Sequence, residues 1–177
     1  DQVRDIATAA RDASHELGLA DADARDEALK AAARAIREAA SRLLDANAKD
    51  VAFGEEKGLG AAMLDRLMLD DARIEAMAEG LEDIAAMDDP VGRVTEEWER
   101  PNGLRIQRVT VPLGVIGIIY ESRPNVTADA GGLCLKAGNA AILRGGSESL
   151  HSSTLIAECL QHGLKQAGLP TAAVQAI

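Results

Sequence analysis

Two short polar segments hold the side chains that are best suited to bind or transform a ligand. The first covers residues 120–125, Tyr-Glu-Ser-Arg-Pro-Asn, and the second covers residues 144–149, Arg-Gly-Gly-Ser-Glu-Ser. Each contains an arginine, whose planar guanidinium can bind a phosphate or a carboxylate through two parallel hydrogen bonds. Each also precedes a helical pattern, so we expect free backbone N–H groups and the positive end of a helix dipole beside it. Both segments are therefore candidate anion-binding sites.

Strands are predicted directly before both segments. Residues 115–119, Val-Ile-Gly-Ile-Ile, form an apolar run typical of a strand buried on both faces, and residues 140–143 form a second such run. Helices are predicted at residues 126–137 and 150–166, and a third strand starts near residue 173. This order is the first half of a doubly wound, parallel, Rossmann-like α/β sheet, in which ligands bind at the carboxyl ends of the strands. Residues 112–177 thus predict half of a nucleotide-binding domain, and we expect the remaining strands beyond residue 177.

The sequence pattern predicts helices over residues 1–90 and a β-hairpin over residues 91–111. One helix should end at Gly18, a long one should run from about Asp23 towards Gly54, and a short one should follow. Asp70 or Asp71 can cap the last helix. The hairpin strands flank a Pro-Asn-Gly turn. Their apolar alternation changes phase near Arg108, which a bulge or a change of neighbouring sheet would explain.

The residues alone leave several alternatives open for the two polar segments. Asn125 could simply cap the helix that follows Pro124, and the Gly145-Gly146 pair could be no more than a tight connection. Both arginines could be ordinary surface residues. The chain has no Gly-x-Gly-x-x-Gly fingerprint after a strand, because Gly114-x-x-Gly117 lies before and within one.

Composition limits the classes of function. The formal charge of −10 argues against a general nucleic-acid or anionic-membrane binder. No apolar run approaches the roughly 20 residues of a membrane span and no secretory leader is visible, so we expect a cytoplasmic protein. Cys134 and Cys159 have no CxxC spacing, and the three histidines show no metal-ligand spacing. We therefore expect neither a disulfide framework nor a metal site.

Two stretches carry a family resemblance. Residues 111–127, which include Arg123-Pro124-Asn125-Val126, and residues 135–149, which include Arg-Gly-Gly-Ser-Glu, resemble the glutamyl-phosphate reductase branch of the aldehyde dehydrogenase superfamily. Ordinary aldehyde dehydrogenases tend to have Pro-Trp-Asn and Lys-Pro-Ser-Glu at these places. The hairpin residues 98–109 also look like this branch.

The resemblance implies a reaction. NADPH would reduce L-glutamyl 5-phosphate to L-glutamate 5-semialdehyde with release of phosphate, the second step of proline synthesis. A cysteine thiolate would attack the acyl phosphate, and the matching asparagine, Asn125, would donate to the oxyanion. Neither Cys134 nor Cys159 matches the family nucleophile, so we expect that cysteine and its catalytic domain beyond residue 177, and residues 1–177 alone to be inactive.

The resemblance also implies cofactor and partner contacts. Ser122, Arg123 and Pro124 should line the cleft near the nicotinamide or the acyl phosphate, although Arg123 could instead pair with Glu121. Arg144 should bind the 2′-phosphate of NADP, unless it only pins its loop to an acidic helix. Gly145, Ser147 and Glu148 should shape the same pocket. Because a carboxylate would repel the 2′-phosphate, Glu148 should face a hydroxyl or a cation. Copies of the chain should associate as a homo-oligomer through the hairpin.

Two other classes of function are alternatives for this chain. One is another acyl-reducing member of the superfamily, such as a CoA-acylating aldehyde dehydrogenase, against which the Arg-Pro-Asn-Val and Arg-Gly-Gly-Ser residues argue. The other is a non-catalytic nucleotide-binding or assembly module. An unfinished sheet argues against that module, since an open strand edge invites aggregation.

Overall fold

A parallel three-stranded sheet forms the centre of the computed structural model, which describes residues 2–177. The strands β3 (Val115–Ile119), β4 (Ala140–Arg144) and β5 (Val174–Ala176) lie side by side in that order. Helix α6 (Asn125–Lys136) connects the first two, and α7 (Leu150–Gln166) connects the last two. The predicted β-α-β-α-β order is confirmed, and it places the loops after β3 and β4 at the same edge of the sheet.

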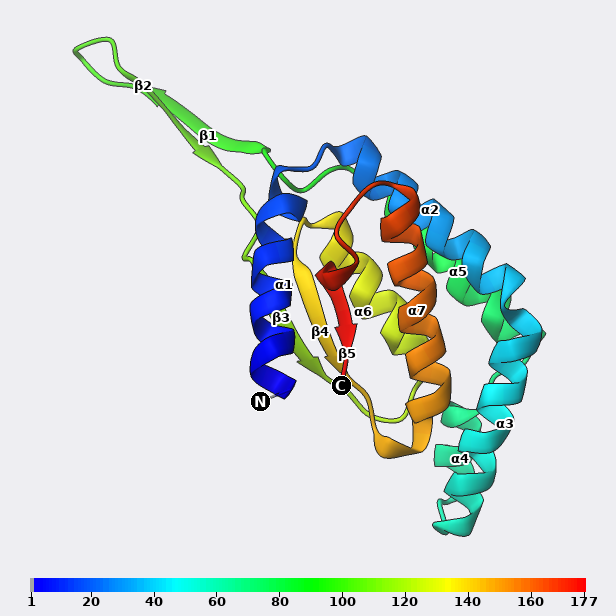
Figure 1. The fold of residues 1–177 in the computed structure, drawn as a ribbon. Helices are drawn as coiled ribbons and strands as arrows, with labels where there is room; N and C mark the ends of the chain where they lie inside the picture. The colour runs from blue at the N-terminus through cyan, green and yellow to red at the C-terminus, as the bar shows by residue number, and fades with distance from the viewer. Residues whose placement is uncertain (1) are drawn as a thin grey trace.

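Helices cover the sheet in layers (Figure 1). Helix α1 (Gln2–Leu19) packs on one face, while α6 and α7 pack on the other. A further layer, formed by α2 (Ala22–Glu38) and α5 (Asp71–Ala86), packs on α6 and α7. Small residues allow the close approach of these layers: a Cβ at Gly163 of α7 would lie 2.2 Å from the carbonyl oxygen of Ala28 in α2. The alanine-rich composition therefore serves close helix packing.

The expected single helix from about Asp23 to Gly54 is two helices. Helix α2 ends at Glu38, and α3 (Ala40–Glu56) begins after Ala39, whose ψ of 3° departs from helical geometry. Ala39 is fully buried, and α3 leaves the α5 layer to reach the short helix α4 (Ala61–Leu67) and the start of α7. Tertiary packing thus breaks a segment that is rich in alanine and other residues that favour helix. By contrast, the predicted cap of α5 is confirmed, since Asp70 Oδ1 accepts from Arg73 N at 2.7 Å.

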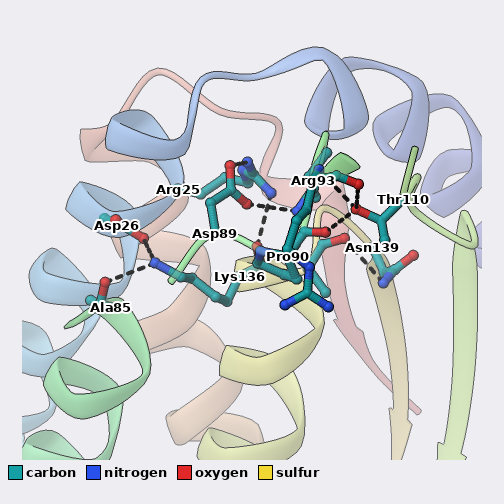
Figure 2. A network of polar contacts seen from close by, with 11 residues as sticks. Arg25, Asp26, Ala85, Asp89, Pro90, Arg93, Thr110, Lys136 and Asn139 are labelled. Atoms are coloured by element: carbon teal, nitrogen blue, oxygen red, sulfur yellow. Dashed lines mark hydrogen bonds and ion pairs between the residues drawn. The ribbon is translucent and has the colours of Figure 1, made fainter. Parts of the chain in front are cut away.

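The hairpin projects away from the helices and the sheet (Figure 1). Strands β1 (Val94–Glu99) and β2 (Arg105–Val109) pair antiparallel, with the predicted irregularity where Val94 and Glu96 face Val109 and Arg108. Gly103 adopts a φ of +83° in the turn, a conformation that favours glycine. At the root of the hairpin, Thr110 Oγ1 donates to the Pro90 carbonyl and accepts from Arg93 N (Figure 2).

A network of buried charges lies near the amino ends of the strands (Figure 2). Lys136 Nζ donates to Asp26 Oδ1 at 2.6 Å and to the Ala85 carbonyl at 2.8 Å. Arg25 donates to the Lys136 carbonyl at 2.8 Å and to Asp89 Oδ2 at 2.9 Å, while its Nε is buried without a partner among the described residues. The network ties α2, α5 and α6 together. Beside it, Asn139 Oδ1 accepts from the backbone N–H groups that lead into β3, those of residues 113 and 114.

Strand β3 is not buried on both faces, contrary to the expectation from its apolar run. Ile116 and Ile118 are half-buried against the core, whereas Val115 and Ile119 are exposed, Ile119 by 78%. The reason is its position at the edge of the sheet, where α1 contacts mainly β4. One face of β3 is therefore uncovered by residues 2–177.

Candidate functional site

The two polar segments meet at the carboxyl edge of the sheet. Tyr120 N donates to the Arg144 carbonyl at 3.1 Å, which extends the β3–β4 ladder, and Ser122 Oγ donates to Glu148 Oε2 at 2.8 Å. The hydrogen bond from Ser122 lowers the pKa of Glu148 below its ordinary value. Glu148 thus faces a hydroxyl, as expected from the sequence.

Gly146 makes the contact between Ser122 and Glu148 possible, although it was not among the site residues predicted from the sequence. A Cβ at Gly146 would lie 2.1 Å from Ser122 Oγ and 2.9 Å from Glu148 Oε2, closer than side-chain atoms can approach. The neighbouring Gly145 has a similar constraint, because its Cβ would lie 3.3 Å from the Tyr120 hydroxyl. The Gly-Gly pair is the sequence signal that could have identified this position. In the structure, the absence of side chains there lets the loop after β4 pack against the loop after β3.

The expected free N–H groups at the two helix starts are largely occupied. Asp50 of α3, 1% exposed, accepts from the backbone N–H groups of His151 and Ser152 and from the Ser152 hydroxyl. This carboxylate caps α7 from about one hundred residues away in the chain. At the start of α6, the N–H groups of Val126 and Thr127 donate back to the preceding loop. These particular backbone N–H groups are therefore not free to bind an anion.

Asn125 and Arg123 line a cavity of about 440 Å³ beside the start of α6. The cavity lies between α6, α5 and the end of α4, and its wall contains Met68, Leu69, Ala76 and Met77. Its charged lining comprises three arginines and two aspartates: Arg66, Arg73, Arg123, Asp65 and Asp129. Four of these five lay outside the candidates taken from the sequence. Only Asp129 had a usable signal, since it follows Asn125 by four residues and so shares its helix face.

The structure places the other residues of the first loop as follows. Pro124 is buried at the position that precedes α6, where its fixed φ suits a helix start. Glu121 lies 4.0 Å from Arg66, and the guanidinium of Arg123 has no hydrogen bond or ion pair within residues 2–177. The alternative pairing of Arg123 with Glu121 is therefore not formed.

Both cysteines are buried helix residues. Burial raises the pKa of Cys134, and it raises the pKa of Cys159 to about 11. A thiol of this kind stays protonated at neutral pH and is a poor nucleophile. Within residues 2–177 no group of three histidine, cysteine, aspartate or glutamate side chains is placed to hold a metal ion. No helix in the same range has the length and apolar character needed to cross a membrane.

The family model described as the aldehyde dehydrogenase family matches residues 1–177. The chain belongs to the aldehyde dehydrogenase family. Its strands and helices have the arrangement of the amino-terminal part of that fold.

This chain is similar over nearly its whole length to proteins of the glutamyl-phosphate reductase branch of the family. The gamma-glutamyl phosphate reductase of Rhodospirillum rubrum is 64% identical over 98% of this chain, which spans 40% of that protein. The crystal structure of the Thermotoga maritima gamma-glutamyl phosphate reductase is 41% identical, with a TM-score of 0.97 over 100% of this chain and 43% of its own. The Saccharomyces cerevisiae enzyme of the same name is 36% identical, with a TM-score of 0.92 over 98% of this chain and 45% of its own. The chain thus spans about two fifths of the relatives it matches.

Members of the family use NAD or NADP, and the residues at the carboxyl edge fit such a group. Arg144 is exposed at the end of β4, and its guanidinium forms no hydrogen bond or ion pair within the described part of the chain. The alternative of an ion pair to an acidic helix is therefore not seen there. Gly145 and Gly146 border a cavity of about 100 Å³, and Ser147 beside them is exposed. An unpaired guanidinium beside a glycine-lined hollow suits a phosphate with its attached sugar.

Proposed function

We propose that the full-length protein carrying this chain is a cytoplasmic glutamyl-phosphate reductase of proline synthesis. It would convert L-glutamyl 5-phosphate, NADPH and a proton into L-glutamate 5-semialdehyde, NADP and phosphate. When bound, NADPH supplies the hydride for this reduction. The observation that carries the proposal is the placement of Asn125 and Arg123 in one charged cavity, in a chain 64% identical to a curated protein of that name.

Asn125 is the group proposed to act on the reacting carbonyl. It starts α6 at the carboxyl edge of the sheet, and its Nδ2 donates to Asp129 Oδ2 at 3.0 Å. That bond fixes the orientation of the amide and leaves its second N–H available to an oxyanion. A donor held before the reaction stabilises the charge without reorganisation. The nucleophilic cysteine is proposed to come from outside residues 1–177.

Two arginines are proposed to take the phosphate groups. Arg123 lines the cavity with Asn125 and would neutralise the departing phosphate of the substrate. Arg144 would bind the 2′-phosphate of NADPH, with Gly145 and Ser147 shaping the surrounding pocket. The Ser122–Glu148 bond is compatible with this arrangement, because it gives the carboxylate a hydroxyl partner beside the proposed phosphate site. The exposed hairpin is proposed to join copies of the protein into a homo-oligomer.

The reaction is best tested in the oxidative direction with the full-length protein. L-glutamate 5-semialdehyde and NADP are supplied with inorganic phosphate, with coenzyme A, or with neither, and NADPH formation is followed by its absorbance. The proposal predicts turnover that depends on phosphate. Turnover that depends on coenzyme A would identify a CoA-acylating enzyme, and binding of NADP with no turnover under any condition would identify a non-catalytic module.

A further inference from the structure

Asp129 is a half-buried carboxylate that has no ion-pair partner among the described residues. It lies one helical turn after Asn125, lines the same cavity and is half-buried, with its Oδ1 close to Gly80 of α5. Its one recorded bond is the hydrogen bond accepted from Asn125. Three arginines line this cavity, yet Asp129 forms an ion pair with none of them among the described residues. The other aspartate of the cavity, Asp65, pairs with Arg73 at 2.9 Å.

The carboxylate of Asp129 does not favour the folded state. Burial raises its pKa above the ordinary value, and the hydrogen bond from Asn125 offsets this only in part. A raised pKa for an acid means that the folded state binds its proton more tightly than the unfolded state does. Stability is therefore lost as the pH rises past the unfolded value and the group ionises. A carboxylate with a perturbed pKa that lines a cavity is a candidate for a binding role.

A glutamyl chain is long enough to contact Asn125 and Asp129 at the same time. In the proposed reaction the acyl carbon lies beside Asn125. The carbon that bears the amino group is three carbon–carbon bonds away, each about 1.5 Å long. Side chains four residues apart on a helix have Cβ atoms about 5–6 Å apart. An acyl group at Asn125 therefore puts the amino group within reach of Asp129.

We propose that Asp129 binds the α-ammonium group of the substrate and thereby selects an amino-acid acyl phosphate over the same chain without its amino group. The inference rests on the proposed function and names a specificity determinant for it. Arg66, Arg73 and Arg123 give the cavity one positive charge more than its two aspartates, which suits a substrate whose net charge is negative. Asp129 is then the group that distinguishes the cationic end of the substrate from its anionic groups.

A different role for Asp129 would be to position Asn125. Its hydrogen bond to the amide would then serve the oxyanion donor and would matter equally for every acyl substrate. The two roles are separable by replacing aspartate with asparagine. Asp129→Asn keeps an acceptor oxygen for Asn125 and removes the charge that would pair with an ammonium.

The test compares two aldehydes in the full-length protein, with NADP and phosphate in the oxidative direction. One is L-glutamate 5-semialdehyde, and the other is 5-oxopentanoate, which has the same carbon chain without the amino group. For Asp129→Asn we expect kcat/KM to fall about 10- to 100-fold for the amino aldehyde, mainly through KM, the factor for losing a hydrogen bond between charged groups. The value for 5-oxopentanoate should change little. Because both proteins see the same aldehyde solution, any cyclised fraction of the amino aldehyde cancels.

Asp83→Asn, the same change at an exposed aspartate of α5 outside the cavity, is the matched control and should leave both values unaltered. Thermal unfolding checks that Asp129→Asn is at least as stable as the wild type. Equal losses for both aldehydes, or no loss for either, would overturn the ammonium role while leaving the proposed reaction intact. A wild-type protein that oxidises neither aldehyde would instead overturn the proposed function, and the inference with it.

Discussion

The two ends of the parallel sheet hold cationic side chains in opposite circumstances. Near the amino ends, Arg25 and Lys136 are 2% and 5% exposed, and each donates to a carboxylate and to a backbone carbonyl. At the carboxyl ends, Arg123 and Arg144 are exposed, and their guanidinium groups have no partner within residues 2–177. Figure 2 shows Arg25 and Lys136 with their hydrogen-bond and ion-pair partners.

The difference separates cationic side chains that stabilise the fold from cationic side chains that are available to a ligand. Transfer of a charge from water into the interior costs several kcal/mol, so Arg25 and Lys136 require their partners, and their partners require them. An exposed cation without a partner contributes little to folding, because water already solvates it. The amino ends of the strands therefore anchor three helices, while the carboxyl ends carry unpaired charge, which we propose binds phosphate-bearing ligands.

The largest effect is expected at the amino ends. Lys136→Met should lower the free energy of unfolding by about 3–5 kcal/mol, because it leaves Asp26 and the Ala85 carbonyl without their donor. Arg144→Met, the matched control, should change it by less than about 0.5 kcal/mol. Urea denaturation of the full-length proteins measures both values. Equal destabilisation by the two variants would remove the distinction between the two ends of the sheet.

At the carboxyl ends, the largest effect is expected on catalysis. Asn125→Ala should lower kcat of the full-length protein by about 10²–10³, the scale for losing one oxyanion donor. Its thermal stability should stay close to that of the wild type, because the Asn125 side chain is exposed. A folded variant with an unchanged kcat would show that Asn125 is only a surface residue at the start of α6.

A smaller effect is expected on coenzyme choice. Arg144→Met should weaken NADPH binding by about 1.5–3 kcal/mol, the range for hydrogen bonds to charged groups, and should weaken NADH binding much less. Titration calorimetry with both coenzymes measures the two losses. If both coenzymes lose the same affinity, Arg144 holds its loop and does not bind the 2′-phosphate.

The smallest effect concerns the bond between the two loops. Ser122→Ala should cost at most about 1 kcal/mol at neutral pH, because the Ser122–Glu148 pair is only partly buried. The bond lowers the pKa of Glu148 from 4.5, so its stabilisation is present above that pH and is lost as the pH falls through the folded-state pKa. The difference between variant and wild type should therefore vanish in acid. A difference that is constant with pH, or one that persists in a Glu148→Gln background, would show that the bond is not its cause.

Local patterns were enough to predict the order of the elements at the sheet. The helix stop at Gly138, which adopts a φ of +71°, and the cap at Asp70 both depend on residues next to one another in the chain. The break at Ala39 could not be predicted, because an alanine-rich segment favours one helix until packing turns it. The exposure of β3 could not be predicted either, since an apolar run gives no information on which strand lies at an edge.

In the candidate site too, local sequence patterns predicted some features, and contacts between distant segments determined the others. The pattern of strands and helices predicted that Asn125, Arg123 and Arg144 lie at the carboxyl edge of the sheet, where the structure has them, and the family resemblance implied their roles. The groups that shape their surroundings come from distant parts of the chain. Asp50 occupies the start of α7, Ser122 reaches Glu148, and α4 and α5 supply Arg66 and Arg73 to the cavity. No spacing within the sequence predicts such long-range contacts.

One crossed measurement tests whether the amino ends of the strands hold the fold while the carboxyl ends bind the coenzyme. Thermal unfolding of the full-length wild type, Lys136→Met and Arg144→Met is recorded with and without NADPH at about 100 times the wild-type Kd, where ligand binding stabilises by roughly 2.7 kcal/mol. The account predicts that Lys136→Met unfolds at a lower temperature yet keeps the full stabilisation by NADPH. Arg144→Met should unfold at the wild-type temperature without ligand and lose most of that stabilisation. The account is contradicted if Lys136→Met loses the response to NADPH while Arg144→Met keeps it, or if both variants lose stability and response alike.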